Sequence, residues 1–479
     1  MSLSSSEYAG YDSVGLADLI RSKEVTAMEV AACAIDAVRA VNSELNAVVE
    51  TYSDGVTANP VIDAPLTGVP TLIKDIGNIE PGRLVEFGSR LGIGNTSSVS
   101  THLFDRIGAA GLVPIGRSAS SELAIAGVTE TAAFGPTRSP WDRDRSAGGS
   151  SGGAGAAVGS GMVPIAIGSD GGGSIRIPAS CCGVVGLKPT RGRISPAPFG
   201  AALAGFATSF VLTRTVRDSA LALDLLAGQV AGDPYPITPS GAGYMENLDR
   251  LPRGLRIAIG LNSFSSHEVD PEVAGATSAV GELLTEMGHQ VEADQPAVPW
   301  DSFLWAMATM WAADAAHFAG RVSSLTGRPI DDTQLEPQTL TICEEGAKIS
   351  SQELLSAGDI FNDVNRRLAR FFENYDILVT PTLGQLPPEI GRYRPEGTLD
   401  SVSFFGSWAD VESFLPLFNC GGQPAISLPL AQSSAGLPIG VQLVGGFSDD
   451  MSVLQLARAL EVALPWAERI PLIHVSRRS

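Results

Sequence analysis

Short apolar segments typical of buried strands alternate with helix-like segments along most of this chain. The strand-like segments include NAVVETY at 46–52, GVPTLIK at 68–74, VVGLK at 184–188, LRIAIG at 255–260, DILVTPT at 376–382 and IGVQLVG at 439–445. Between them lie helix-like stretches such as 216–227 and an Ala-rich run after Thr26, which has Glu29 at capping-box spacing. Strands separated by helices predict an α/β fold. We expect one domain over 1–479, with a core at about 60–220 and 370–470 and a cap-like helical excursion at about 230–370.

The charge and composition exclude several classes of protein. The 479 residues carry 52 acidic and 32 basic side chains, a formal net charge of −20 that would repel nucleic acid. The apolar stretch 201–212 is too short for a membrane span. The first ten residues lack the basic and apolar regions of a signal peptide, and the five cysteines form no C-x-x-C motif. We therefore expect a cytoplasmic protein with no nucleic-acid or membrane partner.

Three consecutive glycines, Gly171, Gly172 and Gly173, stand directly before Ser174 in the segment SDGGGSIRIPAS. Glycine loses much conformational freedom on folding. Such a run therefore indicates a turn around a phosphate, a turn around an oxyanion or a merely flexible loop. No glycine in the chain is followed by lysine, which excludes a P-loop. GAGAAV at 153–158 lacks the last glycine of a dinucleotide fingerprint, so phosphate binding is disfavoured.

Other hydrolytic motifs fit poorly. GGSSG at 148–152 matches the G-x-S-x-G elbow of α/β-hydrolases, but the segment before it, SPWDRDRSA, is polar rather than a buried strand. None of the five histidines stands in a recognisable catalytic context. Neither H-E-x-x-H nor a paired Cys/His cluster indicates a metal site.

Lysine is rare, since only Lys23, Lys74, Lys188 and Lys348 occur among the 32 basic residues. Lys74 ends the apolar segment GVPTLIK. One interpretation is a lysine whose ammonium reaches solvent and pairs with the following aspartate. The other is a catalytic base, because a buried lysine can lose its proton and arginine cannot. This segment alone leaves both interpretations open.

Three segments taken together resemble the amidase signature family: GVPTLIKD, SAGGSSGGAGAAVGSG, and GSDGGGSIRIPASCCGVVGLKPTRGRIS. The resemblance covers most of the chain and is weakest at about 230–370 and 385–410. It implies a mixed twisted sheet surrounded by helices, with Ser174 as nucleophile, Ser150 as bridging serine and Lys74 as base. It also suggests a cis peptide bond at Gly149–Ser150. CGVVGLKPTRGRISP and FNCGGQPAISLPL are most similar to a family member that acts on aliphatic, nylon-type amides.

An acyl-transfer enzyme needs donors already in place for the negative oxygen of its tetrahedral intermediate. We expect the N–H groups of Gly171, Gly172, Gly173 and Ser174 to form this oxyanion hole. For Lys74 to act as a base, burial must lower its pKa from about 10.4 toward roughly 7 to 8. The mechanism implied by the resemblance needs neither a metal nor an organic cofactor.

The substrate pocket is expected in the variable parts of the chain, where aromatic residues gather. We select Trp305, Trp311, Phe404 and Trp408 as its candidate wall. The expected partner is a small, uncharged, apolar or aliphatic amide, bound by a monomer or homodimer. Aryl acylamides, carbamates, and glutamine in a tRNA-dependent amidotransferase subunit remain alternatives.

Overall fold

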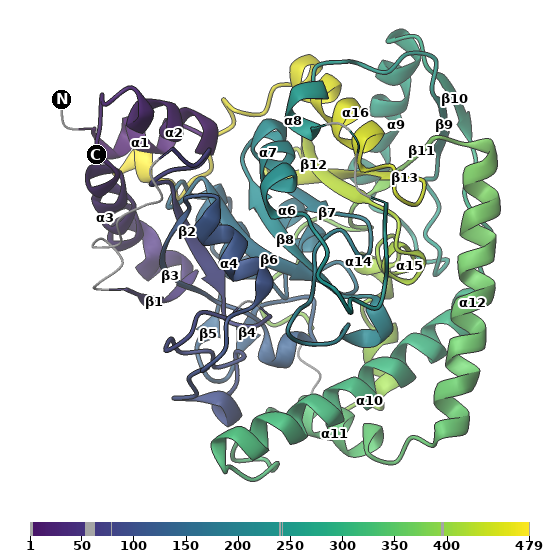
Figure 1. Cartoon of the computed structure of the whole chain (residues 1–479). Helices are drawn as coiled ribbons and strands as arrows, with labels where there is room; N and C mark the ends of the chain where they lie inside the picture. Colours follow the sequence, from purple (N-terminus) through teal and green to yellow (C-terminus); the bar gives the residue numbers. More distant parts are fainter. Residues whose placement is uncertain are drawn as a thin grey trace.

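Eleven strands form one sheet through the middle of the molecule (Figure 1). The computed structural model describes residues 3–52, 63–77, 79–238, 241, 243–393 and 397–478. In spatial order the strands are β1 (Val48–Thr51), β3 (Val113–Ser118), β2 (Pro70–Lys74), β6 (Ile165–Asp170), β8 (Thr208–Thr213), β7 (Val185–Lys188), β12 (Ala425–Gln432), β13 (Pro438–Gly445), β11 (Ile377–Pro381), β9 (Arg256–Ile259) and β10 (Gln290–Ala293).

The sheet is mixed in direction. β2 runs parallel to β3 and β6, and β9 runs parallel to β10 and β11, whereas the other neighbours are antiparallel. Every residue of β2, β7 and β13 is buried, as continuous apolar strand segments predict for a sheet covered on both faces. The predicted α/β fold with helices around a mixed sheet is confirmed.

Helices surround this sheet on both sides (Figure 1). They are α1 (Ser5–Gly10), α2 (Ser13–Arg21), α3 (Ala27–Leu45), α4 (His102–Ala109), α5 (Gly152–Gly159), α6 (Arg176–Cys182), α7 (Val216–Leu226), α8 (Tyr244–Asn247), α9 (Pro271–Glu286) and α16 (Asp450–Ala463). The predicted capping box begins α3, where the Thr26 hydroxyl accepts from the Glu29 N–H and the Glu29 carboxylate accepts from the Thr26 N–H. None of the described helices is long and apolar enough to cross a membrane.

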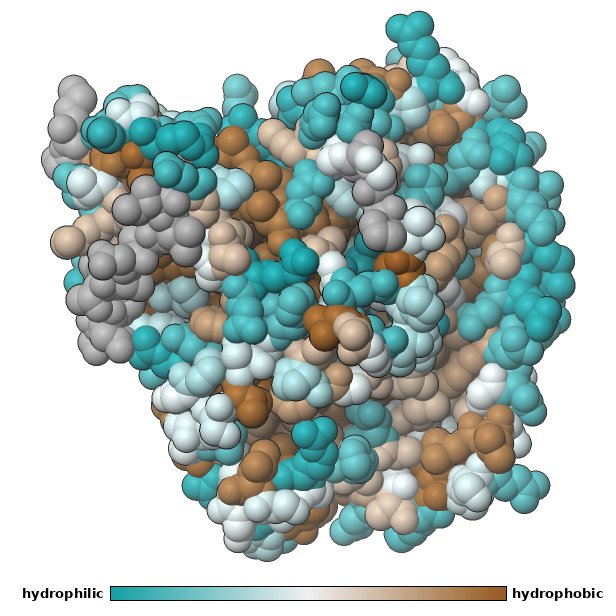
Figure 2. Space-filling model, viewed as in Figure 1, coloured by the Kyte–Doolittle hydropathy of each residue, from teal (hydrophilic) through white to brown (hydrophobic). Residues whose placement is uncertain are grey.

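Three further helices form an arm beside the sheet: α10 (Trp300–Thr326), α11 (Pro337–Gly346) and α12 (Ser351–Asn374). α10 has 27 residues and is about 40 Å long at 1.5 Å per residue. It packs against both of the others. α12 buries one face, with residues at helical spacing: Ala357, Phe361, Val364, Leu368 and Phe371. Its outer face is hydrophilic (Figure 2).

The helical excursion expected at about 230–370 is shorter in the structure. β9 and β10 lie within that range, yet they extend the main sheet next to β11, with α9 between them. The helical arm therefore begins at Trp300. The strand character of 255–260 is visible in the sequence, but its place in the sheet depends on pairing with β11, far along the chain.

Two apolar clusters meet where the candidate site lies. One fills the space between the sheet and its covering helices. The other joins α10 and α12 to two short helices, α13 (Ser401–Gly406) and α15 (Pro416–Gly421), and includes Trp408, which directly precedes the short helix α14 (Ala409–Glu412). The site takes side chains from both clusters.

Candidate active site

Lys74 is the last residue of β2, and its side chain is fully buried. Hydrogen bonds join its Nζ to Ser150 Oγ at 2.7 Å and to Ser169 Oγ at 2.9 Å. Burial lowers the pKa of Lys74 to about 7, while the negative charge of Asp170 acts in the opposite direction. A substantial fraction of the Lys74 amine is therefore uncharged at neutral pH.

Asp75, which follows Lys74, does not act as its counter-ion. Its carboxylate pairs with Arg117 and accepts hydrogen bonds from the main chain of Glu86 and Gly88. Of the two interpretations of Lys74, a solvent-reaching ion pair is excluded by this arrangement and by the burial of Nζ. The interpretation that fits the structure is the other one, a buried lysine whose amine can lose its proton.

Ser150 faces Lys74 from the glycine-rich segment before α5. The Gly149–Ser150 peptide bond is cis, as the family resemblance suggested. The neighbouring hydroxyl of Ser151 is engaged elsewhere, because it accepts from the Ser169 N–H and donates to the Ser169 carbonyl, each at 3.2 Å. Ser150 therefore presents the hydroxyl that meets the lysine.

Ser174 lies in the turn between β6 and α6, beside the Ser150 segment, where the Ser151 N–H donates to the Ser174 carbonyl at 3.2 Å. Its side chain is 8% exposed and opens onto a pocket. No described residue hydrogen-bonds to Ser174 Oγ. Catalytic hydrogen bonds are often long in unliganded enzymes and shorten when substrate binds.

A buried ion pair fixes the glycine turn. Asp170, at the end of β6, accepts from the Arg176 guanidinium at 2.9 Å through both carboxylate oxygens, and from Asn419 at 2.9 Å. Arg176 also donates to Gln442 at 2.8 Å, which ties the turn to β13. These hydrogen bonds hold the loop around the three glycines in place. Because both charges are fully buried and paired, losing either one would leave the other uncompensated.

The glycine turn leaves several main-chain donors available. Among the described residues, no acceptor pairs with the N–H groups of Gly171, Gly172 or Ser174. The N–H of Gly173 differs from the expectation, because it donates to Asp170 Oδ1 at 2.7 Å. Gly173 has φ of +135°, and a Cβ there would lie 2.6 Å from Leu415 Cδ1, so this position requires glycine for the shape of the turn.

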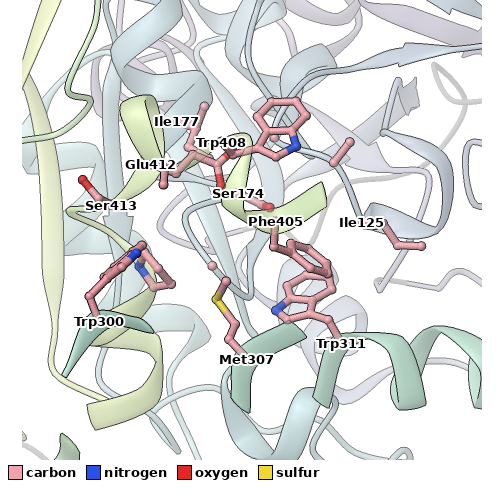
Figure 3. Close-up of a pocket in the computed structure, with 15 residues that line it drawn as sticks. Ile125, Ser174, Ile177, Trp300, Met307, Trp311, Phe405, Trp408, Glu412 and Ser413 are labelled. Carbon is pink, nitrogen blue, oxygen red and sulfur yellow. The ribbon is translucent and has the colours of Figure 1, made fainter. Parts of the chain in front are cut away.

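The pocket at Ser174 has a wall of large apolar side chains. Figure 3 shows Trp408, Glu412 and Ile177 near Ser174 on one side, with Trp300, Met307 and Trp311 of α10 across from them. The other lining residues are Ile125, Ala126, Gly127, Gly172, Phe405, Ala409, Ser413 and Pro416.

Two of the four predicted wall residues line this pocket, and two do not. Trp311 and Trp408 do. Trp305 is six residues from Trp311 on α10, which at 100° per residue turns it about 120° away. Phe404 is buried edge-to-face against Trp408 and Phe405, so it supports the wall from behind. Phe405 takes its place in the pocket.

Sequence reasoning missed Ser169, which contacts Lys74, and several pocket residues, including Trp300, Met307 and Glu412. Ser169 precedes Asp170 within the recognised motif, so its place at the end of a strand was a usable signal. No signal in the sequence pointed to Glu412, because its position in the pocket wall depends on how two short helices pack. In the described part of the chain, no three His, Cys, Asp or Glu side chains gather as metal ligands.

Comparison with known proteins agrees with this geometry. The model of the Amidase family matches residues 29–454. The chain is 35% identical to 6-aminohexanoate-cyclic-dimer hydrolase of Paenarthrobacter ureafaciens over 98% of both chains.

Two solved structures extend the likeness. A structure of 6-aminohexanoate cyclic dimer hydrolase complexed with substrate aligns with TM-score 0.91 and 33% identity, covering 97% of this chain and 99% of that one. A bacterial aryl acylamidase of the amidase signature family aligns with TM-score 0.86 and 28% identity, covering 96% and 97%. The chain therefore belongs to the amidase signature family and is a hydrolase of amide C–N bonds, similar to 6-aminohexanoate-cyclic-dimer hydrolase.

Proposed function

We propose that this enzyme hydrolyses small, uncharged and largely apolar amides through a Ser174–Ser150–Lys74 relay and an acyl-enzyme. The observation that carries the proposal is the 2.7 Å contact between Ser150 Oγ and a fully buried Lys74 Nζ, whose pKa is about 7. An uncharged amine has a lone pair with which to accept a proton from serine, and arginine in its place would not.

In the first half-reaction, Lys74 accepts the proton of Ser150 while Ser150 accepts that of Ser174. Ser174 Oγ then forms a bond to the amide carbonyl carbon. The proton returns through Ser150 to the leaving nitrogen, which departs as a neutral amine when its bond to carbon breaks. In the second half-reaction water takes the place of Ser174 as the nucleophile, and the acid is released.

The N–H groups of Gly171, Gly172 and Ser174 donate hydrogen bonds to the negative oxygen of each tetrahedral intermediate. Gly173 has a supporting role, because Asp170 holds its N–H. Removing one such donor from a hydrolase typically costs about 3 kcal/mol of transition-state stabilisation, so the turn has a strong influence on rate.

The pocket supports an apolar substrate. Four aromatic side chains, Trp300, Trp311, Phe405 and Trp408, line it together with Met307. Burying a large apolar group of a substrate there stabilises the complex by about 25 cal/mol per Å² of area removed from water. Aliphatic and cyclic amides fit the likeness to 6-aminohexanoate-cyclic-dimer hydrolase. Aryl acylamides are a second candidate, because the wall is aromatic and the aryl acylamidase structure is similar.

We further propose that the enzyme acts on free small molecules in the cytoplasm, as a monomer or homodimer. The net charge of −20 disfavours nucleic acid, and five cysteines that are all free fit a reducing compartment.

The test is hydrolysis by the purified chain of the 6-aminohexanoate cyclic dimer, hexanoyl p-nitroanilide and glutamine, with product detection by mass spectrometry. We expect turnover of at least one of the first two, weak or no release of ammonia from glutamine, and loss of all turnover in Ser174→Ala. Efficient turnover of glutamine alone would contradict the proposal.

A further inference from the structure

Glu412 is an unusual residue for the wall of an apolar pocket. It is the one ionisable side chain among the fifteen residues that line the space at Ser174. Its Oε1 atom is buried and has no hydrogen-bond partner among the described residues. This oxygen lies over Gly127, where an added Cβ would come within 1.7 Å of it. Packing therefore holds this carboxyl oxygen against the wall, and no residue that the structure describes is its hydrogen-bond partner.

Glu412 also lacks a counter-ion in the described part of the chain. The nearby charges are those of Asp410 and Asp170, which pair with Arg392 and Arg176 respectively. Burial and these two acidic neighbours raise the pKa of Glu412 to about 8. At neutral pH the side chain is mainly a neutral carboxylic acid, with one donor and a carbonyl-type acceptor.

A second unpartnered polar atom lies one helical turn away. Trp408 also lines the pocket, and its Nε1 is buried with no partner among the described residues. Residues four apart on a helix share a face, and Figure 3 shows both side chains beside Ser174. The Trp408 ring is fixed by stacking on Tyr393, with centroids 4.1 Å apart. Unpartnered buried polar groups are costly, so two of them on one pocket wall indicate a ligand that supplies their partners.

We propose that Glu412 and Trp408 form a subsite for a second, neutral amide-like group on the acyl part of the substrate. The Trp408 N–H donates to the carbonyl of that group, and the Glu412 carboxyl accepts from its N–H. Because the acyl part stays bonded to Ser174 through both half-reactions, it is the part that such a subsite must hold. This inference rests on the proposed relay and adds to it two residues that select the substrate: one amide is cleaved at Ser174, and Glu412 and Trp408 recognise a second.

The test compares four p-nitroanilides whose acyl chains differ only at the far end. Adipamoyl ends in a carboxamide and 6-methylheptanoyl is its apolar isostere, while 6-aminohexanoyl and adipoyl end in an ammonium and a carboxylate. We expect kcat/KM for the carboxamide to exceed that for the apolar isostere by about tenfold, the size of effect that one or two neutral hydrogen bonds produce.

Substitutions at Glu412 show whether the hydrogen bonds of this side chain or its charge recognise the substrate. In Glu412→Leu the carboxamide-to-isostere ratio should fall to about two, because only the Trp408 hydrogen bond remains, whereas Glu412→Gln, which keeps a donor and an acceptor, should retain it within about twofold. Gly127→Ala should lower the ratio as Leu does, because its methyl displaces the carboxyl. Glu344→Leu, an exposed glutamate on α11, is the matched control and should leave the ratio unchanged.

A ratio that is the same in wild type and Glu412→Leu would overturn the subsite. So would a preference of the wild type for the ammonium chain that Glu412→Gln abolishes, since that result would assign the carboxylate to a cation. Fluorophosphonate labelling of Ser174 in every variant distinguishes these failures from failure of the relay. A wild-type enzyme that neither labels at Ser174 nor cleaves any of the four anilides would overturn both proposals.

Discussion

The relay segments and the pocket wall lie side by side, but they are held in place by different forces. Lys74, Ser150 and the Ser174 turn are anchored in or beside the central sheet, and hydrogen bonds and a buried ion pair fix them. The wall is made mainly by α10, α13, Trp408 and α14, and aromatic side chains of α10 and α13 and that of Trp408 pack on one another. In the proposed function, the reaction depends on polar groups that tolerate little change, whereas substrate choice depends on apolar packing that can vary. Substitutions in the two regions should therefore have effects of different size and kind.

The largest effect is expected at Lys74. Lys74→Ala and Lys74→Arg should each lower kcat/KM by about 10⁴-fold, because alanine removes the general base and guanidinium keeps its proton. Steady-state kinetics with hexanoyl p-nitroanilide measures this loss, and circular dichroism checks that the variants fold. An active Lys74→Arg enzyme would remove the lysine from the mechanism.

Ser150→Ala should have a smaller effect, about 10²- to 10³-fold in kcat/KM, because the nucleophile is still present but is deprotonated less effectively. The rate at which a fluorophosphonate modifies the enzyme should fall in parallel, with no change in the site of modification. Ser151→Ala serves as the control within the same segment and should be much less damaging. Equal losses in the two variants would assign a structural role to this segment.

The pH dependence follows from the lowered pKa of Lys74. The amine must be uncharged to accept a proton, so kcat/KM for a neutral substrate should be level above pH 7 and fall tenfold per unit below it. Lys188 is a suitable control, because burial lowers its pKa to about 7 as well but its Nζ donates to the Pro189 main-chain carbonyl and, within the described chain, to neither serine of the proposed relay. In Lys188→Met the acidic limb should keep its midpoint, and a shift would mean that the profile reports the wrong lysine.

The smallest effect is expected in the pocket. Trp311→Ala should lower kcat/KM for apolar anilides about tenfold, mainly through KM, because it removes a wall that contacts the substrate. Trp305→Ala removes an equally large side chain from the other side of α10 and should change kcat/KM less than twofold. Similar losses in both variants would show that α10 acts through its overall packing rather than through its pocket face.

This contrast also explains what could be predicted from the sequence. The residues of the proposed relay stand in local motifs that are visible along the chain, and the family resemblance carried by those motifs assigns the roles of Lys74, Ser150 and Ser174. The role of Gly173 could not be predicted, because only the folded turn shows its N–H directed to Asp170. In the pocket, Trp311 and Trp305 look alike in sequence. Which of them faces the substrate depends on the rotation of α10, and that is set by contacts with α11, α12 and α13.

The central claim is that the chain activates Ser174 rather than Ser150. The most direct measurement is to react the enzyme with a fluorophosphonate, digest it and assign the adduct by tandem mass spectrometry. The account predicts one adduct, on Ser174, formed faster above pH 7 than below it and absent in Ser174→Ala. An adduct on Ser150 in the wild type, or labelling of Ser174 at an undiminished rate in Lys74→Ala, would contradict it.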